Sequence, residues 1–271
     1  MKKILIIFNG IHFPSAVVSH AAQIAQADGA LLCGIFINSL KLKQGLGYAF
    51  PNDLALTQRD YTTESDEAEG RQLVATQIQL FEDECSAVGV PHKVRFYQQT
   101  SAQDLIAHSA YADLIIADAK TEFNEFPLSQ ILAGAHCPVY LVKPEALPVE
   151  RVVLAFDGSL NSMHAIKQYA YLLPQWQPLP TSLVSVIPKG AAPAEGEDYL
   201  TDWLHQHFKD VKTERLQGTA KDELIRFLQK TPNALVVMGA FGRSALSRWM
   251  HQSIADVVLQ ESPASMFITH L

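Results

Sequence analysis

The sequence is poor in cysteine, has no excess of positive charge and contains no long apolar run. Its three cysteines, Cys33, Cys85 and Cys137, lie far apart and form no CxxC pair. This spacing excludes a disulfide scaffold and the common zinc sites, and it predicts three reduced, mostly buried thiols. Acidic residues outnumber basic ones by 28 to 21, which gives a net charge of −7. An acidic chain argues against a general nucleic-acid binder, which normally shows a basic stripe.

The apolar segments are too short for a membrane span or a secretion signal. The apolar run that follows Met1-Lys2-Lys3 ends after five residues, at Asn9-Gly10, whereas a signal peptide needs about 7–15. No apolar stretch approaches the roughly 20 residues that cross a bilayer. We therefore expect this run to be a core strand, and the protein to be cytoplasmic with no membrane partner.

Several catalytic motifs are also absent. The chain has no GxxxxGK[ST] loop, no GxGxxG after its first strand and no GxSxG elbow. These absences disfavour a P-loop NTPase, a nicotinamide-binding domain and a serine hydrolase. The ten histidines show no metal-ligand spacing. We therefore expect neither a resident metal nor an enzyme.

Two similar stretches indicate that the chain repeats one pattern. Residues 3–10 (KILIIFNG) and 151–158 (RVVLAFDG) each predict a buried strand that runs into a turn. In both halves a helix, a second strand and further strand–helix units follow in the same order. This alternation predicts an α/β fold with a mainly parallel sheet in each half. The proline-bracketed segment 143–150 joins the halves, so we expect modules at 1–144 and 149–271 in a fixed arrangement.

Two local expectations concern the helices. Residues 38–70 predict a solvated loop or short hairpin with an acidic cluster at 64–69, and a helix is expected from about 71 to 88. Such a long connection suggests a lid or a partner surface. In the second half, Asn161 or Ser162 is expected to cap a helix that ends near Leu173.

One segment carries residue types that suit anion binding. The residues Met238-Gly239-Ala240-Phe241-Gly242-Arg243-Ser244 leave the carboxyl end of a predicted strand, where open α/β sheets bind ligands. Two glycines let the backbone approach a ligand, and successive N–H groups can form an anion-binding concavity to which Arg243 adds positive charge. The same glycines also suit an ordinary strand-to-helix turn, so the motif alone leaves both interpretations open.

Together, these features resemble the universal stress protein family. The resemblance rests on the repeated pattern, the Asp-Gly-Ser turn at 157–159, the Met238-Gly239-x-x-Gly242 segment and the final Ser-Pro-Ala-Ser-Met-Phe-Ile strand. It covers nearly the whole chain as two tandem modules and is weakest over 38–70. It implies an open, five-stranded parallel sheet flanked by helices in each module, of the Rossmann-like type, and a role in stress response. For the nucleotide-binding branch it implies an ATP site with the pattern G-x2-G-x9-G-[ST] and an aspartate after the first strand.

The second module matches much of the adenosine part of this pattern. By the resemblance, Asp157 would contact the adenosine part of the nucleotide, where its carboxylate can accept hydrogen bonds from ribose hydroxyls. Ala155 and Val186 would line the adenine slot, although core packing explains both equally well. An Asx-type turn without any ligand is the alternative interpretation of Asp157.

The phosphate part of the pattern matches less completely. Gly239 and Gly242 match the two loop glycines and Ser253 matches the final Ser/Thr, but Gln252 replaces the third glycine. We therefore expect adenosine recognition to survive better than triphosphate recognition. The expected ligand is ATP, ADP or AMP, with or without Mg²⁺, and the expected site comprises Ala155, Asp157, Val186, Met238, Gly239, Gly242, Arg243, Gln252, Ser253 and Ile254.

The first module departs further from the family pattern. Asn9 replaces the aspartate, and the segment Asp118-Ala119-Lys120-Thr121 has no glycine and places a negative charge where phosphate would lie. We expect a degenerate module that binds no nucleotide triphosphate. By the resemblance, it would pair with its twin as separate chains of the family pair in homodimers, which gives an intramolecular pseudo-dimer.

Two functions stay open on the sequence alone. In the first, an adenine nucleotide is a regulatory ligand of the second module, and a protein partner responds to the conformation that it favours. In the second, both modules and the 38–70 insertion form a nucleotide-independent interaction scaffold. Slow ATP hydrolysis or autophosphorylation at the same loop has no identifiable catalytic base, and further homodimerisation is open.

Overall fold

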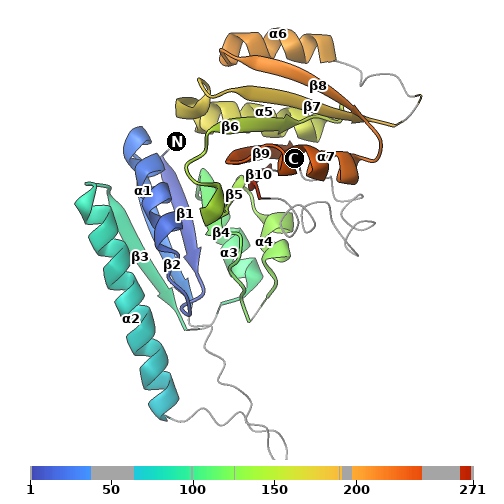
Figure 1. The fold of residues 1–271 in the computed structure, drawn as a ribbon. Coiled ribbons are helices and arrows are strands. Elements are labelled where there is room, and N and C mark those ends of the chain that lie inside the picture. Colours follow the sequence, from blue (N-terminus) through green and yellow to red (C-terminus); the bar gives the residue numbers. More distant parts are fainter. Residues whose placement is uncertain are drawn as a thin grey trace, which may run out of the picture.

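The chain forms one ten-stranded sheet covered by helices on both faces. The computed structural model describes residues 2–37, 64–98, 100–124, 126–188, 190, 197–239 and 263–269. The strands within these ranges follow the order β3-β2-β1-β4-β5-β10-β9-β6-β7-β8 (Figure 1). The α/β class and the parallel pairing within each half are confirmed. The two five-stranded sheets that we expected are joined edge to edge.

The elements of the two halves follow the same order. The first half contains β1 (Lys3–Phe8), α1 (Ser15–Asp28), β2 (Leu31–Ile37), α2 (Glu64–Ala87), β3 (His92–Tyr97), α3 (Ala102–Ser109), β4 (Leu114–Asp118), α4 (Leu128–Gly134), β5 (Val139–Val142) and the 3₁₀ turn η1 (Pro144–Ala146). The second contains β6 (Arg151–Ala155), α5 (Leu160–Leu172), the 3₁₀ turn η2 (Pro174–Trp176), β7 (Thr181–Ile187), α6 (Glu197–His207), β8 (Val211–Gln217), α7 (Ala220–Gln229), β9 (Ala234–Gly239) and β10 (Ser265–Thr269).

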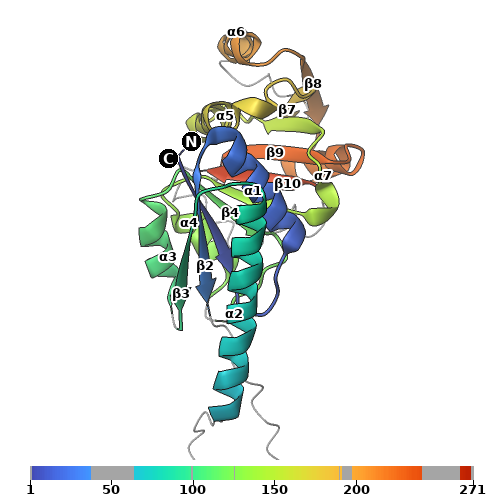
Figure 2. The ribbon, with the colours of Figure 1, turned by 90° about the vertical axis from the view of Figure 1, so that its left-hand side faces the viewer.

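The central strands are largely apolar because both faces of the sheet are covered there, whereas the edge strands β3 and β8 carry polar residues. In β1, every residue from Ile4 to Phe8 is buried. Figure 2 shows α1 and α2 on one side of the first-half strands, and α3 and α4 on the other. The apolar residues accordingly form two clusters: one contains residues of α1, α2, α5 and α6, and the other contains residues of α3, α4 and α7.

An antiparallel pair of strands joins the two halves. Strand β5 pairs with β10 so that Tyr140 lies opposite Phe267, and all the other strand pairs of the sheet are parallel among the described residues. The backbone N–H of Lys143 donates to Ser265 Oγ at 2.9 Å across this junction. The halves therefore share backbone hydrogen bonds as well as packed side chains.

Aromatic side chains reinforce this junction on the face that carries α1 and α5. His20 of α1 lies 3.1 Å from the Tyr140 hydroxyl through its Nε2 atom, and its ring stacks on Trp176 of the second half with centroids 5.6 Å apart. On the other side of the junction, Tyr169 of α5 meets Phe267 edge to face at 5.9 Å. Each half thus contributes one helix side chain that contacts an aromatic residue of the junction strands.

Two local predictions are wrong. Helix α2 begins at Glu64 rather than near residue 71, so the acidic cluster at 64–69 is helical and is not a solvated loop. Acidic residues favour the first turns of a helix because its amino end carries partial positive charge. Gly70, a residue type common in loops, lies inside the helix. The cap of α5 is Ser159, whose Oγ accepts a hydrogen bond from the N–H of Ser162 at 3.1 Å.

The cysteine prediction is confirmed, since Cys33, Cys85 and Cys137 are free and buried. Burial raises the pKa of the Cys85 and Cys137 thiols to about 12. No helix in the described ranges is long and apolar enough to cross a membrane. Those same ranges contain no cluster of His, Cys, Asp or Glu side chains that could hold a metal ion.

Candidate functional site

The strand order makes the carboxyl end of β6 the topological switch point of the second half, which is where open α/β sheets form their ligand crevice. Strand β6 lies between β7 and β9, so the chain leaves β6 toward β7 on one side and later returns to β9 on the other. Ligands of open α/β sheets bind where the connections diverge in this way, beyond the carboxyl ends of the strands. Asp157 follows β6 at this point, and Gly239 ends β9.

Asp157 forms a tight turn between β6 and α5. Its Oδ1 atom accepts a hydrogen bond from the N–H of Ser159 at 3.0 Å, and Gly158 adopts a left-handed φ of 82°. A side chain other than glycine would be strained at that φ. The turn places Ser159 at the N-cap of α5. The Asp157 carboxylate therefore lies beside the amino end of this helix, where the helix dipole favours negative charge.

Local contacts keep the Asp157 carboxylate in its charged form. Desolvation opposes the charge, but hydrogen bonds from Ser159 and from the Ser162 side chain outweigh this effect and lower the pKa of Asp157 below its ordinary value. The residue is nonetheless exposed. Asp157 is therefore an ionised, fixed acceptor that a ligand can reach.

Gly239 allows β9 to contact the first turn of α5 directly. A Cβ atom added to it would lie 2.4 Å from the carbonyl carbon of Asn161 and 2.7 Å from the backbone nitrogen of Ser162. Backbone atoms of a helix cannot move aside as a flexible side chain can. Gly239 therefore has a packing role at the crevice wall that the sequence motif did not reveal.

The other predicted site residues divide into three groups. Met238 is buried, Ala155 is partly buried, and both pack in the cluster that includes α7, which fits core packing. Val186 is partly exposed near the end of β7 and pairs with Leu216. The predicted residues Gly242, Arg243, Gln252, Ser253 and Ile254 lie outside the described residues.

Ser185, near the carboxyl end of β7, is a polar residue of this region that belongs to no sequence motif. This residue is 2% exposed, and its hydroxyl has no hydrogen-bond partner. Leaving a buried hydroxyl unpaired costs about 1–3 kcal/mol. The available signal was a serine between Leu183 and Ile187 on one face of the strand.

The corresponding edge of the first half is closed by its own chain. Asn9 forms the same kind of turn as Asp157, since its Oδ1 accepts from the N–H of Ile11 at 3.0 Å and Gly10 has a φ of 72°. In addition, Asn9 Nδ2 donates to the carbonyl oxygen of Glu122 at 2.9 Å. The loop after β4 is thereby fastened to the end of β1.

Further contacts hold this loop in place. Asp118, which corresponds to Gly239, is buried and accepts the N–H of Lys120 at 2.9 Å. Phe123 and Phe126 are buried in the same loop and stack at 5.1 Å. The loop therefore contributes its own apolar core and hydrogen bonds.

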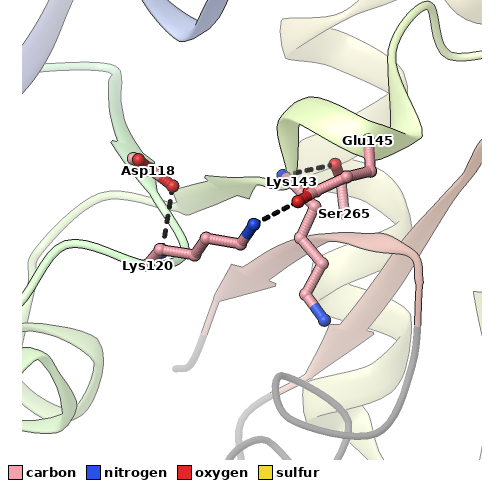
Figure 3. Close-up of polar contacts among 5 residues, drawn as sticks. All are labelled: Asp118, Lys120, Lys143, Glu145 and Ser265. Carbon is pink, nitrogen blue, oxygen red and sulfur yellow. Dashed lines mark hydrogen bonds and ion pairs between the residues drawn. The ribbon is translucent and has the colours of Figure 1, made fainter. Parts of the chain in front are cut away.

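A surface ion pair links this loop to the segment between the halves. Figure 3 shows the Lys120 ammonium directed at the Glu145 carboxylate of η1, while the Lys143 side chain points away from this pair. The contact raises the pKa of Lys120 and lowers the pKa of Glu145. Both side chains are exposed, so the pair adds little to stability. Closure of this edge rests mainly on Asn9 and the buried phenylalanines.

Comparison with known proteins agrees with this architecture. The model of the universal stress protein family matches residues 148–270. A universal stress protein of Methanocaldococcus jannaschii is 26% identical over 137 residues, which cover 44% of this chain and 81% of that protein.

Solved structures extend the fold comparison to the whole chain. A universal stress protein from Archaeoglobus fulgidus superposes with a TM-score of 0.72 at 13% identity, over 98% of this chain and 96% of that one. A functionally unknown protein from Pseudomonas aeruginosa gives a TM-score of 0.57 at 15% identity, over 100% and 92%. At these identities the likeness establishes the fold alone. In sequence, the second half of the chain is thus similar to the universal stress protein family over residues 148–270.

Proposed function

We propose that the second half binds an adenine nucleotide, ATP, ADP or AMP, as a regulatory ligand at the crevice between β6 and β9. The observation that carries the proposal is the exposed, ionised Asp157 carboxylate at the strand crossover, beside the amino end of α5. A fixed carboxylate is a good acceptor for the two adjacent hydroxyls of a ribose. The unpaired Ser185 hydroxyl near the end of β7 adds a second polar group in the same region.

In this proposal the chain binds and orients the nucleotide without reacting with it. Asp157 accepts hydrogen bonds from the ribose, and the positive end of α5 favours a nearby negative group. Gly239 keeps α5 close to β9 and thus fixes the width of the crevice. The first half, closed at its own edge, acts as the built-in partner of the second.

Substitution of Asp157 by asparagine tests the site without disturbing the turn, because Asn9 supports the same turn in the first half. A hydrogen bond to a charged group contributes about 1.5–3 kcal/mol, so Asp157→Asn should weaken ATP binding roughly 10- to 100-fold. Asp202→Asn makes the same charge change at an exposed position of α6 and serves as the matched control.

The readout is the thermal midpoint of the full-length protein with millimolar MgATP, and with MgGTP as the base-specificity control. A ligand at 100 times its Kd adds about 2.7 kcal/mol of stability, which is a shift of several degrees. A shift with ATP alone that Asp157→Asn removes and Asp202→Asn keeps would support the site. Nucleotide retained through purification must be removed first, since it would mask the shift.

A second candidate function is a nucleotide-independent interaction scaffold built from both halves and the 38–70 insertion. The closed edge of the first half favours it, because one module has already lost its ligand crevice. Of the insertion, residues 64–70 form the start of α2, and the rest lies outside the described residues. Equal thermal midpoints with and without MgATP in nucleotide-free protein would favour this scaffold.

A further inference from the structure

A small cavity lies on the α3 side of the first-half sheet, toward the amino ends of its strands. Its volume is about 120 Å³, and its polar lining consists of Lys3, Arg95, His108 and Tyr111 over an apolar floor from β1 and β2. Lys3 begins β1, Arg95 lies in the middle of β3, and His108 lies in the last turn of α3. The fold thus brings together basic side chains that are far apart in the sequence.

One wall of the cavity is held in place by a hydrogen bond. Tyr97 lies two residues after Arg95 on the same face of β3, and its hydroxyl is 2.8 Å from Nε2 of His108. This contact ties the edge strand β3 to α3. His108 is consequently positioned by the protein before any ligand arrives, which reduces the entropic cost of binding.

The two permanent cations of the cavity have no counter-ion in the part of the chain that the structure describes. Within the described ranges, no ion pair engages the Lys3 ammonium or the Arg95 guanidinium. The carboxylate next to the start of β1 belongs to Asp113. It accepts the backbone N–H groups of Lys2 and Lys3, at 2.7 and 2.8 Å. Positive charge at the cavity therefore remains available to a ligand.

The size of the cavity limits what can fill it. A water molecule takes about 30 Å³ of liquid volume, so the cavity holds the equivalent of about four waters. Sites for larger ligands span about 300–1,000 Å³, which excludes a whole nucleotide. From the size, the two cations and the converging donors, we propose that this cavity binds a small tetrahedral oxyanion with the size and charge of inorganic phosphate. Arg95 can donate two parallel hydrogen bonds to such an anion, and Lys3 adds a point charge.

The second half provides an internal comparison, because Arg151 corresponds to Lys3 there, whereas the positions of Arg95 and His108 carry other residues. On the edge strand β3, Arg95 pairs with Ile35 of β2. In the second half, Glu214 of the edge strand β8 pairs with Val184 of β7 and so occupies the position that corresponds to Arg95. On α7 of the second half, Phe227 occupies the position that corresponds to His108 on α3. Each lies three residues after a buried leucine of its helix, Leu224 in α7 and Leu105 in α3. A glutamate and a phenylalanine at these positions give neither positive charge nor a donor. The oxyanion site is thus specific to the first half.

The comparison also supplies the test variants, since the fold already accommodates those residues in its other half. Arg95→Glu and His108→Phe are titrated with sodium phosphate by calorimetry on the full-length protein, against sodium chloride at matched ionic strength. Lys212→Glu is the matched control, because it makes the same charge reversal on β8, the opposite edge strand of the sheet. We expect saturable binding to the wild type and to Lys212→Glu, at least tenfold weaker binding to Arg95→Glu, and weaker binding to His108→Phe.

Two outcomes would overturn the proposal. One is the absence of saturable phosphate binding to the wild type. The other is equal affinity of Arg95→Glu and Lys212→Glu, which would place the phosphate elsewhere, for instance at the nucleotide crevice. A second readout covers the case in which a variant misfolds: NMR signals of the His108 ring nitrogens in the wild type should shift as phosphate is added, and unchanged signals at saturation would also refute the site.

Discussion

Acid should destabilise this protein through His20, which lies at the junction of the two halves. The imidazole stacks on Trp176 and meets the Tyr140 hydroxyl at 3.1 Å. Desolvation in this position lowers the pKa of His20 from 6.5 to about 4. A protonated ring would lose its ability to accept the Tyr140 hydroxyl and would place a charge in an apolar contact. The folded chain therefore keeps His20 neutral over a range where the unfolded chain protonates it.

The sign and size of the effect follow from these two pKa values. Between pH 6.5 and about 4 the unfolded state binds a proton at His20 and the folded state does not, so stability falls as the pH falls. The contribution is present in full above pH 6.5, declines by about 1.4 kcal/mol per pH unit, and amounts to a loss of about 3 kcal/mol by pH 4. This is a large share of the 5–15 kcal/mol that typically stabilises a protein.

Urea unfolding from pH 7.5 to 4.5, followed by tryptophan fluorescence, measures the effect. Trp176 reports on the junction because it stacks on His20. His20→Gln keeps an acceptor for Tyr140 but cannot be protonated, so its stability should decline less steeply with acid than that of the wild type. His12→Gln, at an exposed histidine, should follow the wild type. Parallel profiles for the wild type and His20→Gln would refute this account.

Three other substitutions test features of the core and of the two edges. Tyr169→Phe removes a buried hydroxyl without a partner, so the free energy of unfolding should stay equal or rise by about 1 kcal/mol. Tyr140→Phe removes the hydroxyl that contacts His20 and should lower the free energy of unfolding by about 1 kcal/mol. Paired urea titrations measure both, and a Tyr169→Phe protein less stable than Tyr140→Phe would contradict this reasoning. Gly239→Ala should cost about 1–3 kcal/mol because its Cβ would meet the backbone of α5, and an unchanged urea midpoint would contradict that clash. Asn9→Asp keeps the turn but removes the donor to the Glu122 carbonyl, so it should cost about 1–3 kcal/mol and speed proteolysis of the loop after β4; a protected loop would argue against the fastening role.

The sequence predicted the α/β class and the buried strands well, because each buried strand is a short apolar run between turn residues. It could not predict the junction of β5 with β10. Two similar halves imply similar folds, but they do not specify which edges meet or in which direction. The start of α2 could not be predicted either, because Gly70 suits a loop and yet lies inside the helix. The acidic residues before it were consistent with either a loop or a helix start.

The candidate site was predictable only in part. The turn after β6 follows from Asp157-Gly158-Ser159, because Asp and Gly have specific roles in such turns. The packing role of Gly239 was not predictable, since it depends on how closely α5 approaches β9. The cavity with Lys3 and Arg95 forms no sequence motif, because three separate elements contribute its basic groups.

The difference between the two edges depends on one atom of a shared turn. In both halves the Oδ1 atom after the first strand accepts a backbone N–H, so the turn itself does not distinguish Asn9 from Asp157. The two residues differ in the second terminal atom of the side chain. In Asn9 it is a nitrogen that donates to the Glu122 carbonyl and closes the edge. In Asp157 it is a charged oxygen, which repels a carbonyl and attracts hydroxyl donors. The same turn therefore presents an amide that closes the edge in the first half and a charged acceptor in the second.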